Sequence, residues 1–522
     1  MQIEATRMTG AVRLFVVGVA SLVLTACVVG PEFVRPEAPV PFAWTQEGAD
    51  GLATQPPQLK EWWRVFEDPV LDELVDTARR NNNTLEIAGL RVLEARAQLG
   101  IAVGSQYPQA QLLAGDATYV SPAETTGASQ GFWSYGLGAS ASWEIDFWGR
   151  FRRGVESADA AFLASIAAYD QALVLLTGAV VTAYATVRSL EEQLRIARDN
   201  VVIQQRSYDI AEVLFRNGAD SELDVQQART LLLSTQATIP ALETSLKQAR
   251  NALSVLLGQT PGSVTDLLAR GQGIPGVPED ISIGLPADML RRRPDVRQAE
   301  MQAMAANALV GLAAADLYPS FSLAGSIGVA AGGSGDSDFG DLFGSDAISW
   351  SVGPSFVWPF LNYGRIKNNI RVQDARLQQA LVNYQEVVLQ AAREAEDAIA
   401  AFVGTRQQST ILAKTVESAI RSNELSTLRY QEGFSDYERV LNAQQALFSQ
   451  QTRFVANQGD TVRTLVDLYT ALGGGWPDQE GRAYISRRTR EAMEQRTDWG
   501  GLMDDTAPRE DNDDGRFREV DW

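Results

Sequence analysis

The sequence predicts a mainly α-helical protein with a small transmembrane β part, arranged as an internal two-fold repeat. Three observations support this fold class. Two proline-free stretches, 150–215 and 365–431, are each long enough for a helix of more than sixty residues. Four segments alternate apolar with small or polar residues, as membrane strands do. Matching motifs recur 215 residues apart, which indicates a duplication.

The chain begins with a segment typical of export. Residues 1–26 are predicted to be a lipoprotein signal peptide, because a basic start precedes the apolar run Leu14–Leu24, which is too short to span a membrane comfortably. The run Leu24-Thr25-Ala26-Cys27 resembles the lipobox of bacterial lipoproteins. That resemblance implies lipidation of Cys27, including palmitate, and Val28 after it favours the outer membrane. Ordinary cleavage beside a bystander cysteine is the alternative.

The rest of the chain divides by composition. The tether is rich in proline, the linker is rich in glycine and proline, and the tail holds 13 acidic and 8 basic side chains with few aliphatic ones. The predicted divisions are a lipid-anchored tether at 27–60, repeat 1 at 61–258, a linker at 259–284, repeat 2 at 285–476, and an acidic, largely disordered tail at 477–522.

The first long helix carries a heptad pattern. One series of seven-residue steps comprises Ile166, Leu173, Val180, Val187, Leu194, Val201, Tyr208 and Phe215. A second apolar series lies between these positions, so the spacing alternates four and three, as in helices packed against other helices. At about 1.5 Å per residue, such a helix reaches roughly 100 Å. The helix in 365–431 repeats the pattern, but its seam turns polar past Thr405, which predicts looser packing there.

The strands are predicted as two β-hairpins, one in each repeat, at 109–146 and 320–358. From Trp133 to Ile145 every odd position is apolar and every even one is small or polar, which fits a strand with one face to lipid and one to water. The strand before it, at about 109–119, alternates poorly. Trp133, Trp143, Trp350 and Trp358 are predicted to anchor the strands at the membrane interfaces.

The duplication extends through strand, junction, long helix and turn. Trp143, Gly149 and Arg150 recur as Trp358, Gly364 and Arg365, and Gly218 recurs as Gly433. A shorter predicted helix returns from each turn, and Pro240 is expected to kink the first of these return helices.

Four strands cannot close into a membrane barrel, and unpaired N–H and C=O groups in lipid cost several kcal/mol each. The smallest barrels need about eight strands. Copies of the chain must therefore share one barrel, and three copies give twelve strands. Because the helices all leave the same ends of the strands, they are expected to form an α-barrel continuous with this 12-stranded β-barrel. The result is a conduit.

Composition excludes several other functions. The chain has 522 residues, a net charge of -20 and no histidine, so imidazole metal sites and histidine-based catalysis are excluded. The negative charge argues against a nucleic-acid partner. With Cys27 assigned to lipid, an enzyme is the least favoured class. No catalytic, cofactor or metal site is predicted.

Several motifs occur in an order that resembles the TolC/OprM family of outer-membrane efflux channels, in its lipoprotein (NodT-type) branch. The resemblance covers about residues 24–476. The motifs are the run Gly30–Pro36, the stretch from Trp62-Trp63 to Asp68-Pro69, Trp143–Arg150, Asn362-Tyr363-Gly364-Arg365, and Leu472-Gly473-Gly474-Gly475-Trp476.

This resemblance implies a homotrimer, lipid-anchored in the outer membrane, with its helices in the periplasm. It also implies a passive exit duct for drugs or other small molecules. A periplasmic adaptor and an inner-membrane RND-type transporter would deliver them. A duct for type I protein secretion shares the fold, because fold alone does not settle cargo. A structural coiled-coil lipoprotein explains the heptads but not the strands between them.

The two helix-turn-helix tips lie farthest from the predicted strands. The candidate gate and adaptor-contact residues are Arg216, Asn217, Gly218, Asp220, Ser221, Arg429, Tyr430, Glu432, Gly433 and Asp436. Gly218 and Gly433 permit the tight reversals, and Asp220, Ser221 and Asp436 can cap the returning helices. The family resemblance implies that these tips close the tube and bind the adaptor. The alternative is that they only make the turns.

Overall fold

The computed structural model describes residues 28–503, except 38–39, 47, 50, 54, 56–57, 122–130, 272, 333–338 and 477–482. The α-helices are α2 (Pro69–Asn81), α3 (Asn83–Gly104), α4 (Arg150–Arg216), α5 (Glu222–Leu256), α6 (Thr265–Leu268), α7 (Pro286–Arg292), α8 (Pro294–Ala315), α9 (Arg365–Gln431), α10 (Tyr437–Ala471) and α11 (Arg487–Glu494). The 3₁₀ helices are η1 (Trp62–Phe66), η3 (Phe339–Phe343) and η4 (Gly500–Met503). The strands are β1 (Leu52–Ala53), β2 (Ala110–Val120), β3 (Phe132–Ile145), β4 (Ile281–Ser282), β5 (Ser320–Ala331) and β6 (Ile348–Val357).

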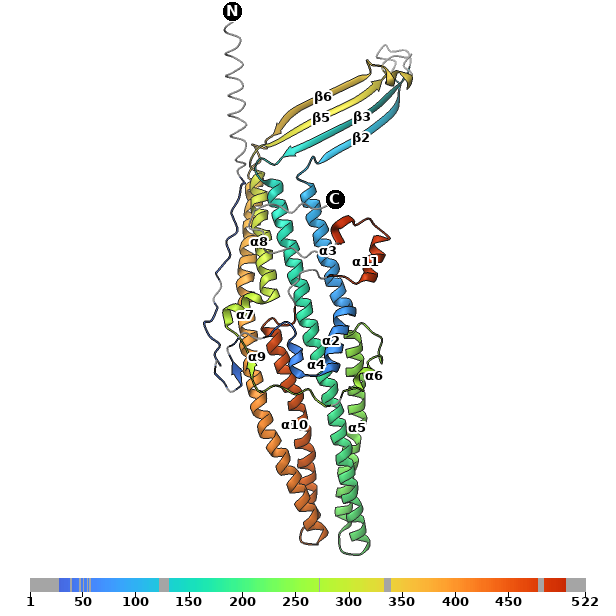
Figure 1. Cartoon of the computed structure of the whole chain (residues 1–522), viewed down its shortest axis with the longest axis vertical. Coiled ribbons are helices and arrows are strands. Elements are labelled where there is room, and N and C mark those ends of the chain that lie inside the picture. The colour runs from blue at the N-terminus through green and yellow to red at the C-terminus, as the bar shows by residue number, and fades with distance from the viewer. Residues whose placement is uncertain are drawn as a thin grey trace, which may run out of the picture.

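The molecule is an elongated set of near-parallel helices with one sheet at its end (Figure 1). The helices leave the sheet on one side, and the α4–α5 and α9–α10 turns form two separate tips at the opposite end. Near the sheet, α4 packs between α3 and α8, and α8 packs against α9. Towards the tips, α4 packs against α5 and α10, and α10 against α9. The predicted arrangement of strands at one end and helices on one side is confirmed.

The two repeats have matching dimensions. Helices α3 and α8 each have 22 residues, α4 and α9 each have 67, and α5 and α10 each have 35. Gly149 and Gly364, which precede the long helices, have φ angles of 77° and 82°. The repeats therefore share their local geometry as well as their motifs.

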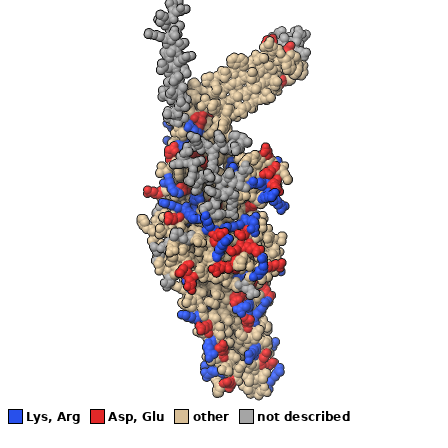
Figure 2. All heavy atoms as spheres, viewed as in Figure 1, with Lys and Arg blue, Asp and Glu red and all other residues tan. Residues whose placement is uncertain are grey.

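The large sheet is antiparallel, with strand order β2-β3-β5-β6, so β2 and β6 are edge strands, each without a second partner among the residues that the structure describes. In the register, Trp143 lies opposite Leu323, which puts the apolar residues of β3 and β5 on one face. The face in view in Figure 2 carries almost no charged side chains, whereas the helical part carries both signs. All four predicted interface tryptophans lie on these strands or just after them, and each is exposed.

The predicted seam of α4 is correct for most of the helix and wrong at its lower end. Its apolar positions from Val155 to Ala197 are buried, except Ala183 and Leu190, which are partly buried, but Phe215 is 41% exposed. Near the tip the buried face passes instead to Asn200, Gln204, Ser207 and Ala211. An α-helix drifts by about 20° per heptad relative to a strict seven-residue repeat, so a nearly straight helix turns its heptad positions away from the contact.

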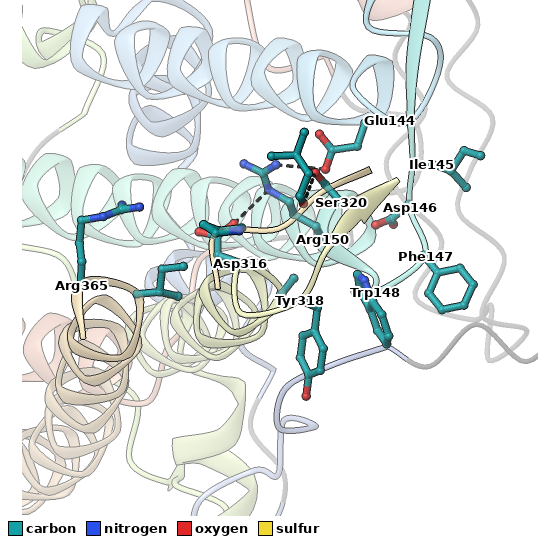
Figure 3. Close-up of a pocket in the computed structure, with 14 residues that line it drawn as sticks. Glu144, Ile145, Asp146, Phe147, Trp148, Arg150, Asp316, Tyr318, Ser320 and Arg365 are labelled. Carbon is teal, nitrogen blue, oxygen red and sulfur yellow. Dashed lines mark hydrogen bonds and ion pairs between the residues drawn. The ribbon is translucent and has the colours of Figure 1, made fainter. Parts of the chain in front are cut away.

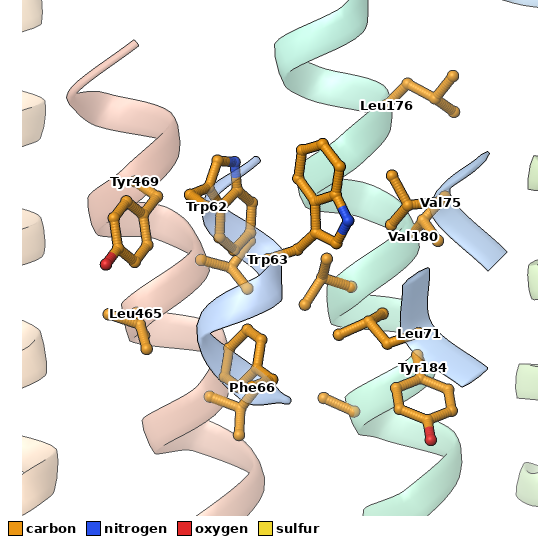
Figure 4. Close-up of a cluster of buried hydrophobic side chains, with 14 of the residues drawn as sticks. Trp62, Trp63, Phe66, Leu71, Val75, Leu176, Val180, Tyr184, Leu465 and Tyr469 are labelled. Carbon is orange, nitrogen blue, oxygen red and sulfur yellow. The ribbon is translucent and has the colours of Figure 1, made fainter. Parts of the chain in front are cut away.

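A hydrophobic core at mid-height holds the helices together (Figure 4). Trp62 of η1 stacks on Tyr469 of α10, with ring centroids 5.0 Å apart. Arg79 lies 4.2 Å over the ring of Trp63, and the Tyr184 hydroxyl donates to Asp68 Oδ2 at 2.6 Å. Both repeats contribute to this core, which therefore fixes the helix pair α4–α5 relative to the helix pair α9–α10. Helix α4 is long and apolar enough to cross a membrane, but 61% of its apolar window is buried in the molecule.

The tether after Cys27 is bound along its first part. Val29 N–H donates to the Trp148 carbonyl at 3.1 Å. The guanidinium of Arg153, only 2% exposed, pairs with Glu32 at 2.9 Å and Glu156 at 2.6 Å. The tether then runs down the outside of the helices (Figure 1). Cys27 and the predicted signal peptide lie outside the described residues.

The prediction that the tail is largely disordered is wrong for residues 483–503, here called the tail segment. Ile485, Met493 and Met503 are buried against Leu93 of α3, and the Ser486 N–H donates to Glu86 at 3.0 Å. A few apolar residues among many charged ones were enough, because α3 offers them an apolar face. Residues 477–482 and 504–522 lie outside the described part. Pro240 lies within α5 without ending it.

Candidate channel gate at the helix tips

Each tip is closed by the same backbone turn. After α4, Gly218 N–H bonds the Phe215 carbonyl and Ala219 N–H bonds the Leu214 carbonyl, both at 2.9 Å. After α9, Gly433 and Phe434 repeat this Schellman pattern at 3.0 and 2.8 Å. The two glycines have φ angles of 71° and 75°, the left-handed conformation that glycine adopts without strain. Both predicted turn glycines are confirmed in this role.

The helices that return from the two turns start differently. Ser221 caps α5, because its Oγ accepts from Asp224 N–H at 3.3 Å, while its own N–H donates to Asp220 Oδ1 at 2.9 Å. Asp436 occupies the cap position of α10, but its side chain makes no capping hydrogen bond. The capping prediction therefore holds for Ser221 and not for Asp436.

A small buried cluster joins the two tips. Its members are Ala211, Val225, Ala228, Tyr430, Tyr437 and Val440. The rings of Tyr430 and Tyr437 meet edge to face, with centroids 5.3 Å apart. The Tyr430 hydroxyl donates a hydrogen bond to Asp220 Oδ2, which connects the end of α9 to the turn after α4. The helix pairs α4–α5 and α9–α10 are thus linked by residues 210 positions apart in the chain.

The charges around this bond affect one another. Burial alone would raise the pKa of Asp220, but hydrogen bonds from Asp224, Tyr430 and Ser221 hold it below the ordinary value of 3.8. The hydrogen bond with Asp220, together with burial, raises the pKa of Asp224. Burial and then Asp220 raise the pKa of Tyr430, and burial raises that of Tyr437 to about 12. Asp224 therefore takes up a proton before Asp220 does as pH falls.

The remaining predicted tip residues stay on the surface. Arg216 pairs with Glu212 of its own helix at 2.8 Å and does not reach the other tip. Asn217 donates to the Val213 carbonyl at 2.8 Å. Arg429 and Glu432 are exposed, and among the described residues neither side chain has a hydrogen bond or an ion pair. Of the candidate gate residues, Tyr430 and Asp220 are the pair that the structure joins by a side-chain hydrogen bond.

Sequence reasoning missed two residues of this site. Asp224 was not selected, although the Ser-x-x-Asp spacing after the turn is a capping signal that could have found it. Tyr437 is 1% exposed and packs on Tyr430. Its signal was weaker, because a tyrosine in the first turn of a helix is equally compatible with solvent exposure.

The class of protein now follows from the fold. A four-stranded sheet with two open edges continues into long helices, and those helices end in two linked tips, as in the outer-membrane channels of efflux systems. The outer membrane efflux protein family model matches residues 74–259 and 285–474. The chain belongs to this family, and its two matched ranges fall on the two repeats, apart from residue 259 at the start of the linker.

Particular relatives support the same assignment. The chain is 32% identical to the cation efflux system protein CusC of Escherichia coli over 459 residues, which is 87% of this chain and 97% of the relative. It is 33% identical to the solvent efflux pump outer membrane protein SrpC of Pseudomonas putida over 466 residues, 88% of this chain and 97% of SrpC.

Solved structures agree with the fold. The outer-membrane channel OprN superposes with a TM-score of 0.79 at 31% identity, covering 86% of this chain and all of the other. The CmeC outer membrane channel of Campylobacter jejuni gives a TM-score of 0.77 at 26% identity, covering 90% and 98%. The chain is therefore an outer-membrane efflux channel protein, and the family resemblance inferred from the sequence is confirmed.

Proposed function

We propose that three copies of this chain form one duct through the outer membrane and the periplasm. Each copy supplies four strands to a twelve-stranded β-barrel and its long helices to a coaxial tube. The observation that carries this proposal is a sheet whose edge strands, β2 and β6, are unpaired within the described part of the chain, and which has an exposed apolar face. Such edges are not stable in lipid unless another copy pairs with them.

The tips are the gate of this duct in the closed state. The bond from Tyr430 to Asp220 holds the two hairpins of a copy together, so opening requires this bond to break. The exposed side chains Arg216, Arg429, Glu432 and Asp436 are available to a periplasmic adaptor. An inner-membrane transporter of the RND type supplies the energy, because the duct has no energy source of its own.

The cargo is small molecules, in line with relatives named for cation, solvent and toluene efflux. Cys27 carries the lipid that anchors the chain beside the barrel. The tether, which the structure describes from Val28 on and which contacts the start of α4, supports this placement. The tryptophans at 133, 143, 350 and 358 sit at the lipid interfaces.

Two measurements test the proposal with the full lipidated chain. Its mass in mild detergent is expected to equal three copies, and in planar bilayers the protein is expected to open discrete ion-conducting pores. A strain that lacks the chain is expected to become more sensitive to drugs and organic solvents, with recovery on complementation. A single-copy mass, or a membrane-inserted chain without conductance, would refute the duct.

A further inference from the structure

The contact between α4 and α10 changes character along its length. Towards the sheet it joins the mid-height core, which includes Leu194, and at its lower end it joins the buried cluster of the tips. Between these two apolar regions the contact holds four amide or hydroxyl side chains, each at most 4% exposed. They are Asn200, Gln204 and Ser207 of α4 and Gln444 of α10, here called the polar layer.

Two hydrogen bonds show how the helices meet in the polar layer. Asn200 Nδ2 donates to Gln451 Oε1 at 2.8 Å, and Gln444 Nε2 donates to Ser207 Oγ at 2.6 Å. Seven residues along α4 therefore match seven residues back along α10, as in an antiparallel coiled coil. Gln204 lies between the two bonds and on the same face of α4, four residues after Asn200 and three before Ser207.

The polar layer is only partly hydrogen-bonded. Both amide atoms of Gln204, Nε2 and Oε1, are buried without a hydrogen-bond partner in the part of the chain that the structure describes. The same holds for the oxygens Asn200 Oδ1 and Gln444 Oε1. A buried polar atom without a partner is unfavourable, because in water it would be hydrogen-bonded. The closed arrangement of α4 and α10 therefore carries an unfavourable contribution at this height.

Neither the length of the helix nor its contact with the other repeat requires this contribution. At the upper end of α4 the Arg150 guanidinium finds partners on both repeats, Glu144 at 3.2 Å and Asp316 at 3.5 Å (Figure 3). In α9, which has the same length as α4, the position equivalent to Gln204 is Ala419, 215 residues later, and alanine has no polar side-chain atom. The unpaired amide is thus particular to the α4–α10 contact.

We infer that the polar layer favours separation of the helix pairs α4–α5 and α9–α10, and that it takes up water when they separate. In the closed state the cluster at the tips and the bond from Tyr430 to Asp220 hold the pairs together. Separation lets water reach the four unpaired atoms, which then gain the hydrogen bonds that they lack. The inference rests on the proposed gate and adds a site in the helices that opposes the bond at the tip.

Substitutions of Gln204 in the full lipidated chain test the sign of this contribution. In Gln204→Met an unbranched apolar side chain of similar length removes both unpaired atoms, so the closed state should gain stability. The ratio of open to closed channels in planar bilayers should fall by about 5- to 100-fold, which corresponds to about 1–3 kcal/mol. Gln204→Glu should raise this ratio at neutral pH, because an unpaired carboxylate is costlier to bury than an amide.

Gln205 supplies the matched control. It is the next residue of α4 and is exposed, and its amide donates to Asp209 of the same helix at 2.8 Å. Gln205→Met and Gln205→Glu make the same chemical changes in water, so both variants should gate like the wild type. An effect at position 205 equal to that at position 204 would overturn the inference.

Thiol labelling measures the entry of water into the polar layer. Ser207→Cys should react slowly with a charged, water-soluble methanethiosulfonate reagent, because position 207 is buried in the closed state. The reaction should become several-fold faster when Tyr430→Phe is added, and slower again when Gln204→Met is added to both. Gln205→Cys should react rapidly in every background. The unsubstituted chain, whose single cysteine is Cys27, gives the background signal.

The outcomes distinguish this inference from the duct itself. If the chain conducts, but the variants at position 204 gate like the wild type and Gln204→Met leaves the labelling of Ser207→Cys unchanged, the inference is wrong and the duct stands. If the assembled chain forms no conducting pore, both are wrong. A larger open fraction in Gln204→Met would also overturn the inference, because the amide would then stabilise the closed state.

Discussion

Removing the hydroxyl of Tyr430 tests how much a single bond holds the gate closed. In the Tyr430→Phe variant the ring stays packed on Tyr437, but the hydrogen bond to the Asp220 carboxylate is lost. Hydrogen bonds to charged groups contribute about 1.5–3 kcal/mol to stability. Tyr430 is only 5% exposed and Asp220 is half-buried, so water screens only part of this contribution.

The closed-to-open equilibrium of each copy should therefore shift by roughly 10- to 100-fold, at about 1.4 kcal/mol per tenfold change. The assay is single-channel conductance in planar bilayers at neutral pH. We expect longer and more frequent open periods than in the wild type, and greater entry of large antibiotics into cells that carry the variant.

The matched control is Tyr437→Phe. That ring lies in the same cluster, but none of the hydrogen bonds found among the described residues involves its hydroxyl. Its conductance should stay close to that of the wild type. Unchanged conductance in Tyr430→Phe, or an equal effect in both variants, would show that the bond does not hold the gate.

The other predictions concern proton sharing, the tail and the core. Asp224→Asn should stabilise the closed tip at neutral pH, because the asparagine amide donates to Asp220 without needing a proton. Wild-type conductance is expected to fall on mild acidification, and the conductance of the variant should not. A variant with the same pH profile as the wild type would contradict this. In Gly89→Ala the added Cβ would lie 1.9 Å from a carbonyl oxygen of the tail segment, so trypsin should cleave the tail segment more readily while conductance stays unchanged. The control Gly100→Ala, whose Cβ meets no atom within 4 Å, should not increase cleavage. Trp62→Ala should destabilise the mid-height core by about 3–5 kcal/mol, and a thermal-unfolding midpoint equal to that of the wild type would refute its role.

The pH sign for the aspartate pair follows from the two directions of shift. The pKa of Asp224 is raised above the ordinary value of 3.8, so its protonated form favours the closed tip and this contribution is lost as pH rises through the raised value. The pKa of Asp220 is lowered, so its contribution is lost only as pH falls through a value below 3.8. The closed tip is expected to be most stable between these two pKa values.

The sequence predicted correctly the helices, strands and turns that a local residue pattern encodes. Proline-free heptads located α4 and α9, and alternation located the strands. Glycines in a duplicated position located both turns, since only the residue at that point needs a positive φ. The prediction of the buried positions of α4 was wrong near its tip. The rotation of heptad positions around a straight helix accumulates with length, and no single heptad reveals it.

By itself the sequence determined the repeat, the long helices, the four strands and the positions of the turns, because each depends on the order of residues within one segment. Only the tertiary structure decided that Tyr430 reaches Asp220 and that the tail segment covers α3. These facts depend on how distant segments pack. Periodicity along the chain records which face of a helix is apolar, but not which partner that face will meet.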